Sequence, residues 1–371
     1  MIFDFISRLK NQKKRKSLAI TTFSVTFAFM KRAKKIANTS SKIFLSLLLG
    51  GTILYWMYRD FDFSQIKEVL LHGMNWSWML LSFPFGILAQ MIRGWRWRQA
   101  LDPVGEHSRK SVAVNAVFLS YAASLVVPRI GEFTRCAVMK RYDDVSFTKA
   151  LGTVVTERVI DSLLVMIITG LTLIFQIRIF DIFFARTGTR LDTFFTQFSL
   201  TGWIVTVVCG IAVIGLVWYL ARRLSVHGKI KDMLHDMFLG VSSLRQVNNA
   251  PLYVFWTLAI WACYFLHYYL TFFCFDATSG LGVDCAIVTF IVGSIAVIVP
   301  TPNGAGPWHF AVKTMLMLYG VGSTDALYFV LIVHSVQTLL VVLLGIWAWA
   351  ALSFTAKKKQ KELGRNMMTD R

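Results

Sequence analysis

The chain alternates between long apolar segments and short polar ones. Eight long segments occur at residues 43–58, 76–92, 111–127, 150–176, 200–221, 252–275, 283–299 and 326–354, and a shorter one at 309–319. A helix that crosses a bilayer needs about 20 predominantly apolar residues. Because several segments approach or exceed this length, the pattern predicts an all-α polytopic membrane protein.

Composition and charge support this class. The chain is 56% hydrophobic and only 16% charged, whereas a soluble domain of this size needs far more polar surface. The net charge of +19 is concentrated beside the apolar segments, at residues 13–16, 31–35, 93–98, 222–223 and 357–361. This is the positive-inside pattern of cytoplasmic loops. We therefore expect contact with anionic lipid headgroups at the cytoplasmic face, and no nucleic-acid partner.

A simple series of crossings conflicts with the charge pattern. If every segment crosses once from a cytoplasmic N-terminus, Arg129, Arg135, Lys140, Arg141 and Lys149 all lie outside. The conflict disappears if residues 111–138 form a re-entrant helical hairpin that breaks at Pro128 and returns to the cytoplasmic side.

A second re-entrant hairpin over residues 283–319, entering from the outside, then makes the C-terminus cytoplasmic as well. The predicted fold has about six full spans plus two re-entrant hairpins. Its halves, about 41–176 and 200–355, have opposite orientations and form an inverted repeat whose hairpin tips meet near the midplane. The alternative is eight or nine simple crossings.

This topology divides the chain into three parts. Residues 41–355 form a single transmembrane domain, and residues 356–371 form a basic cytoplasmic tail. Residues 1–40 form a basic extension whose apolar run, 18–30, is too short to span and fits an interfacial helix. Met30 precedes two basic residues and would itself make a normal start, so we expect the first 29 residues to be either a dispensable extension or the result of a misplaced start.

The first hairpin break carries charges at membrane depth. Pro128 and Gly131 allow the backbone to leave a helix, and Arg129, Glu132 and Arg135 surround them. Such charges are costly in a bilayer and are usually functional. In a helix, Glu132 and Arg135 share a face at i and i+3, and arginine suits bidentate contact with phosphate. The alternative is a cytoplasmic loop with an ordinary ion pair.

The segment 150–176 adds further charges. Arg158 and Asp161 can pair at i and i+3, which leaves Glu157 in need of another partner, and Arg129 and Arg135 are the candidates. A structural ion-pair network that holds the hairpin in place is the alternative to a functional site.

Other polar groups in the spans have two interpretations each. Arg93 lies in an Arg- and Trp-rich stretch, 93–98, where anchoring at the membrane interface competes with headgroup recognition. Asn115 either bonds to neighbouring backbone or contacts a ligand. His267 and His334 are isolated along the sequence and fit hydrogen-bonded core positions.

The late hairpin break is a loop rich in glycine and proline. Its members are Pro300, Pro302, Asn303, Gly304 and Gly306. Backbone amides in such a loop can bind an anion next to the helix that follows. His309 and Lys313 lie one turn apart in that helix.

Enzyme signatures are missing from the sequence. It contains no H-E-x-x-H, P-loop or G-x-S-x-G motif, and its five cysteines form no C-x-x-C pair. We therefore expect no catalytic residues, no metal site and no cofactor.

In their order, these motifs resemble the flippase-like membrane domain of lysylphosphatidylglycerol synthases, a family with stand-alone members. The matching pieces are Arg93 to Arg98, Asn115, Val127 to Arg135, Glu157-Arg158 with Asp161, and Pro300 to Gly306. The resemblance covers roughly residues 41–354 and implies movement or handling of phospholipids in a bacterial inner membrane. It does not imply lysine transfer, since the soluble aminoacyl-transferase domain of the two-domain synthases does not follow.

The resulting expectation is a flippase or scramblase for a phospholipid or another phosphate-bearing lipid. Arg129 and Arg135 would hold the phosphate, and nearby carboxylates would position them or take a proton. The full set of expected headgroup contacts is Arg129, Glu132, Arg135, Glu157, Arg158, Asp161, Asn115 and Arg93. Two other functions remain open: a membrane-embedded transferase acting on a lipid-linked glycosyl or phosphoryl group, and a non-transporting partner of another membrane protein.

Overall fold

The structure, a computed structural model, describes residues 44, 47–59, 61–176, 247 and 249–369. Every regular element in these ranges is a helix, in agreement with the predicted all-α class. Within the described residues, three helices are long and apolar enough to cross a membrane, at Phe147–Phe175, Ala250–Cys274 and Ser323–Thr355. The predicted span 200–221 and the N-terminal extension lie outside the described residues.

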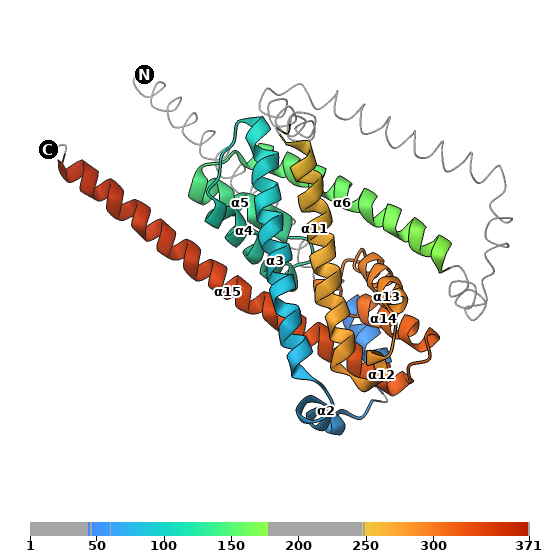
Figure 1. Cartoon of the computed structure of the whole chain (residues 1–371). Helices are drawn as coiled ribbons and strands as arrows, with labels where there is room; N and C mark the ends of the chain where they lie inside the picture. The colour runs from blue at the N-terminus through green and yellow to red at the C-terminus, as the bar shows by residue number, and fades with distance from the viewer. Residues whose placement is uncertain (1–43, 45–46, 60, 177–246, 248, 370–371) are drawn as a thin grey trace, which may run out of the picture.

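The elements follow one another along the chain as Figure 1 shows. An unlabelled helix, Leu47–Tyr58, comes first. The others are η1 (Phe63–Gln65), α2 (Ile66–Leu71), α3 (Trp76–Leu101), η2 (Asp102–Val104), α4 (Lys110–Val126), α5 (Gly131–Asp143), α6 (Phe147–Phe175), α11 (Ala250–Tyr269), η4 (Leu270–Cys274), α12 (Asp276–Ser279), α13 (Val283–Ala296), η5 (Pro302–Gly304), α14 (Pro307–Leu318) and α15 (Ser323–Thr369).

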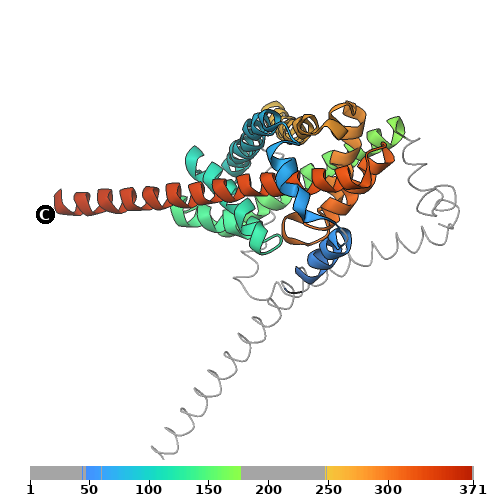
Figure 2. The ribbon, with the colours of Figure 1, turned by 90° about the horizontal axis from the view of Figure 1, so that it is seen from below.

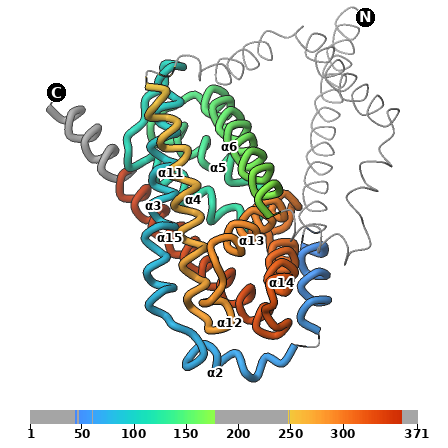
Figure 3. The backbone as a smooth tube through the Cα atoms, turned by 45° about the vertical axis from the view of Figure 1, so that its right-hand side comes forward, coloured from blue at the N-terminus to red at the C-terminus, as the bar shows by residue number. Residues whose placement is uncertain are grey.

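Helix α3 is the centre of the packing. It begins at Trp76 and is capped by Asn75, whose side chain accepts a hydrogen bond from the Ser77 amide (3.0 Å). It lies beside α11 along most of its length (Figures 1 and 3). A side chain at Gly86 would meet the His267 ring at 2.9 Å, so glycine allows the two helices this close approach. The predicted segment 76–92 thus extends by nine residues into the Arg- and Trp-rich stretch.

The chain reverses between α4 and α5, which pack against each other. The helix ends at Val126, and Pro128 lies in the short link where Arg129 adopts a left-handed backbone conformation (φ 63°). Helix α5 begins at Gly131, where any Cβ would collide with the backbone oxygen of Ser120. Glycine is therefore required for α5 to fold back onto α4.

A second reversal joins α13 to α14. Asn303, Gly304 and Gly306 all have positive φ, at 51°, 72° and 92°. A Cβ on Gly306 would lie 2.9 Å from the Gly50 carbonyl oxygen, because the loop packs against the helix Leu47–Tyr58. Figure 3 shows that helix beside α14. The order of one helix, a reversed pair and one helix therefore occurs twice in the described chain, as α3 to α6 and as α11 to α15.

The two largest hydrophobic clusters among the described residues lie at opposite ends of α3. One, around Met79, Phe272 and Phe329, joins the start of α3 to η4 and α15. The other, around Trp97 and Met139, joins the end of α3 to α4, α5 and α6. Large apolar side chains remain exposed along α6 and α15, as expected for helices that face lipid. Residues 356–369 continue α15 as one helix that crosses the bundle and extends beyond it (Figure 2).

We predict that Gly131→Ala destabilises the fold, because the added methyl group collides with backbone rather than with a movable side chain. The expected cost is about 1–3 kcal/mol, typical of overpacking. Thermal unfolding of the purified protein in detergent measures it. Gly170→Ala in α6 is the control, since no atom lies within 4 Å of the position that its added methyl group would take. Equal melting temperatures for the two variants would contradict this account of the break.

Candidate functional site

Buried ion pairs connect α5 to α6 directly behind the first break. Arg135 Nη1 lies 2.7 Å from Glu157 Oε2, and Arg135 Nη2 lies 2.8 Å from Glu132 Oε2. The Arg135 and Glu157 side chains are 2% and 0% exposed. The Glu132–Arg135 pair has the predicted i, i+3 spacing, and Arg135 is the partner that Glu157 needed.

Asp161 gathers three arginines one helical turn further along α6. Its carboxylate lies 3.1 Å from Arg93 Nη1, 2.9 Å from Arg96 Nη1 and 3.2 Å from Arg158 Nη2. Arg96 also approaches Glu157, with 3.5 Å between Nε and Oε1. The two acidic residues of α6 thereby connect α3, α5 and α6 into one set of charges.

We call this set the arginine–carboxylate network. Its members are Arg93, Arg96, Glu132, Arg135, Glu157, Arg158 and Asp161. Four arginines face three carboxylates, which leaves a formal charge of +1. Only Glu132 (32% exposed) and Arg158 (41% exposed) are accessible, and they lie next to each other, with Arg158 Nε 3.5 Å from Glu132 Oε1. The network is therefore sealed on one side and open at this pair.

Aromatic rings and hydroxyl groups fix the guanidinium groups. Arg135 lies over the Trp97 ring at 4.7 Å. Trp97 Nε1 in turn donates to Thr153 Oγ1 (3.0 Å). On the α11 side, Arg96 Nη1 donates to Thr257 Oγ1 (3.0 Å). Stacking on a ring and bonding to a hydroxyl restrict a guanidinium to one plane, so the network is held in a defined geometry.

Several buried donors of the network make no hydrogen bond to any described residue. Leaving aside the nitrogens already placed in ion pairs, they are Arg93 Nε, Arg96 Nη2 and Arg135 Nε. A buried polar group without a hydrogen bond is uncommon and needs an explanation. Together with the formal excess of positive charge, these donors suit the binding of an anion.

Arg129 lies outside the network, contrary to one of the two pairings expected for Glu157. Its exposed side chain donates from Nη2 to the Ile298 carbonyl oxygen (2.8 Å). Ile298 belongs to the link that follows α13. Arg129 therefore ties the first break to the second, and the two breaks lie against each other.

Arg93 and Arg96 correct a sequence-based interpretation. The alternation of Arg and Trp favoured interface anchors whose charges reach water, yet the side chains of these two residues are only 4% and 0% exposed. Both arginines form ion pairs with Asp161, which is 65 residues away from Arg96 in the sequence, and these pairs allow them to be buried. Arg98 does bond outside the network, to the Ser108 carbonyl oxygen (2.6 Å).

Asn115 is not brought to the network. It lines a separate groove of about 440 Å³ between α3, α4 and α15, together with Trp95, Phe118 and Trp347. Among the described residues, none of the seven network members lines this groove.

The late break contacts α15 through its polar atoms. Asn303 Nδ2 donates to Thr338 Oγ1 (2.7 Å), and His334 Nε2 donates to the Asn303 carbonyl oxygen (3.1 Å). The ring centroids of His309 and His334 lie 4.4 Å apart. Sequence analysis treated His334 as isolated, and no local spacing indicates this pair, since the two histidines belong to different helices.

Apolar helices wrapped around a buried set of charges define a multi-pass membrane protein. The family model of the lysylphosphatidylglycerol synthase TM region matches residues 43–345, and the chain belongs to this family. The match confirms the resemblance drawn from the motifs. No curated protein and no solved structure matches the chain.

We predict unequal costs for removing two carboxylates of the network. Asp161→Asn leaves three arginines without their shared counter-charge, and breaking a buried pair costs about 3–5 kcal/mol. Glu132→Gln should cost about 1 kcal/mol or less, because this carboxylate is partly exposed. Melting temperatures of the purified variants measure the difference. Equal destabilisation would contradict a network that is sealed at Asp161 and open at Glu132.

Proposed function

We propose that this protein moves a phosphate-bearing lipid across a bacterial cytoplasmic membrane, as a flippase or scramblase. The observation that carries the proposal is the network itself: an excess of arginine held inside an apolar bundle and accessible at Glu132 and Arg158. Membership in a family named for a phospholipid synthase supports a lipid-related role.

The proposed topology treats α4–α5 and α13–α14 as re-entrant hairpins that enter from opposite sides. Supporting it, each pair breaks at proline and glycine and folds back on itself, and Arg129 joins the two breaks. Irregular backbone is tolerated at membrane depth where protein covers it. Both chain ends and the stretch 93–98 are then cytoplasmic, in line with their basic charge.

Within this topology, the headgroup phosphate would bind at the accessible end of the network. Glu132 bridges Arg135 and Arg158 through its two oxygens. A phosphate group offers oxygens to the same two guanidinium groups and could replace the carboxylate there. Arg135 would remain paired with Glu157 throughout, so the buried charges keep their partners while the ligand is exchanged.

The acyl chains would remain in the bilayer during this exchange. Val159 and Leu163, near Arg158 on α6, are more than half exposed and offer an apolar surface beside the phosphate site. Movement down a lipid gradient needs no further component. Uptake of a proton by Glu132 would release both arginines and would couple movement to a proton gradient.

The remaining predicted contacts take secondary roles in this proposal. Arg93 and Asp161 hold the network together from behind. Arg129 joins the two breaks and lies where a headgroup passing between them would meet it. Asn115, on a separate groove, has no part in the proposed path.

We predict that Arg158→Ala lowers the rate of headgroup translocation by about tenfold or more. The loss of one charge-assisted hydrogen bond, about 1.5–3 kcal/mol, corresponds to this factor. Fluorescent-lipid translocation in proteoliposomes measures the rate with several headgroups. Arg141→Ala is the matched control, because Arg141 is an exposed arginine of α5 that lies over the Tyr142 ring and is not a member of the network.

Three results would count against the proposal. An unchanged translocation rate in Arg158→Ala would show that the headgroup phosphate does not bind at Arg158. An equal loss in Arg141→Ala would show a general effect of surface charge. Absence of translocation by folded wild-type protein with every headgroup would favour the transferase or the non-transporting partner instead.

A further inference from the structure

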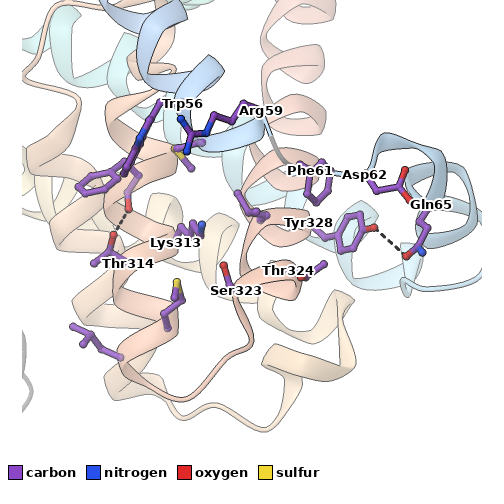
Figure 4. Close-up of a pocket in the computed structure, with 15 residues that line it drawn as sticks. Trp56, Arg59, Phe61, Asp62, Gln65, Lys313, Thr314, Ser323, Thr324 and Tyr328 are labelled. Atoms are coloured by element: carbon purple, nitrogen blue, oxygen red, sulfur yellow. Dashed lines mark hydrogen bonds between the residues drawn. The ribbon is translucent and has the colours of Figure 1, made fainter.

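A cavity with polar and apolar walls lies away from the network. It has a volume of about 790 Å³, within the range of about 300–1,000 Å³ that ligand sites occupy. Four segments line it: the helix Leu47–Tyr58, the link to Gln65, α14 and the beginning of α15 (Figure 4). None of the seven network residues is among the described residues that line it.

The cavity contains more cationic than anionic side chains. Lys313 of α14 and Arg59 lie on neighbouring sides of the hollow, and Asp62 lies at its Gln65 end (Figure 4). The Asp62 carboxylate already accepts a hydrogen bond from the Ser64 amide (2.9 Å), and hydrogen bonds from Ser64 lower the pKa of this carboxyl group. Lys313 forms no ion pair with any described residue. Among the described residues of the lining, two are basic and one is acidic.

Lys313 is the unusual member of this set. Its side chain leaves α14 between apolar neighbours such as Phe310 and Met317 and is only partly exposed. No described residue supplies a counter-ion to this partly buried ammonium group, and a bound anion would do so.

Neutral hydrogen-bonding groups complete the polar side of the cavity. Ser323 and Thr324 present hydroxyl groups from the first turn of α15, and Tyr328 donates to Gln65 Oε1 (3.4 Å). The Ser323 hydroxyl and the Lys313 ammonium group line the same cavity, and such donors suit the oxygens of a phosphate group.

The opposite wall is apolar and reaches the outer surface of the bundle. Trp56 and Phe310 are 58% and 46% exposed, and their ring centroids lie 6.1 Å apart. Leu48 and Leu49, on the same helix as Trp56, are exposed as well. A free inorganic anion makes no favourable contact with this apolar surface, whereas the glycerol and acyl groups of a lipid would pack against it.

We infer that this cavity binds a phosphate-bearing lipid, with the headgroup phosphate held by Lys313 and the apolar part against Trp56 and Phe310. The site goes beyond the transport proposed above, because binding here does not require translocation. In the proposed topology this end of the bundle faces the outer leaflet, so the cavity would receive or release the lipid there.

The test measures phosphatidic acid binding to the full-length protein in detergent by native mass spectrometry. All variants carry Arg158→Ala, which removes the expected contribution of the network site. Adding Lys313→Ala should weaken binding by about tenfold or more, and Lys313→Arg should restore it. Lys67→Ala removes the same charge from the exposed face of α2, outside the cavity, and should change nothing. Diacylglycerol, which lacks the phosphate, should not bind in a Lys313-dependent way.

Each of the other outcomes would overturn the inference. Inorganic phosphate that binds through Lys313 while phosphatidic acid does not would make this a site for a free anion. Equal phosphatidic acid binding by the Lys313→Ala and Lys67→Ala variants would show that the lipid does not bind in this cavity. The melting temperature of each variant shows whether it is folded, and Lys313→Arg keeps the test informative if Lys313→Ala is not. Failure here would leave translocation through Arg158 untouched, so the two proposals fail separately.

Discussion

The buried arginine–carboxylate network is the constraint on which the first half of the fold depends. Charges withdrawn from water cost several kcal/mol each unless they are paired and hydrogen-bonded. Asp161 and Glu157 can meet this requirement only if α3 and α5 lie against the same face of α6. Helix α5 reaches that face because the chain reverses between Val126 and Gly131. The break and the network are therefore parts of one arrangement, since neither charge partner could reach the other along a continuous helix.

The same arrangement separates structural charges from accessible ones. Glu157 and Asp161 are enclosed by arginines and rings, and they hold three helices together. Glu132 and Arg158 lie at the open end, where a ligand can compete for a guanidinium group without unpairing the interior. Arg129 extends the arrangement to the second half through the Ile298 carbonyl oxygen. A transporter built this way would keep its core rigid while a headgroup exchanges at one edge and the two breaks shift against each other.

Sequence analysis succeeded where local periodicity decides the contact. The Glu132–Arg135 and Arg158–Asp161 pairs follow from helical spacing alone, and proline with glycine marked both breaks. It failed where a contact depends on the packing of distant elements. The same Arg–Trp sequence occurs at membrane interfaces and in buried ion-pair networks. Arg96 is buried because it pairs with Asp161, which lies on another helix. The His309–His334 contact and the cavity at Lys313 also depend on helices that are far apart in the chain.

The most direct test of the central claim is an experimental structure of the protein by electron cryo-microscopy in nanodiscs that contain phosphatidylglycerol. The account predicts Arg135 paired with Glu157, Asp161 paired with Arg93 and Arg96, and a lipid phosphate within hydrogen-bond distance of Arg158 at the open end. The contrary result would be Arg93 and Arg96 turned toward headgroups at the membrane surface, with Asp161 and Glu157 paired elsewhere. That result would make the buried charges independent of the hairpin and would remove the proposed headgroup site.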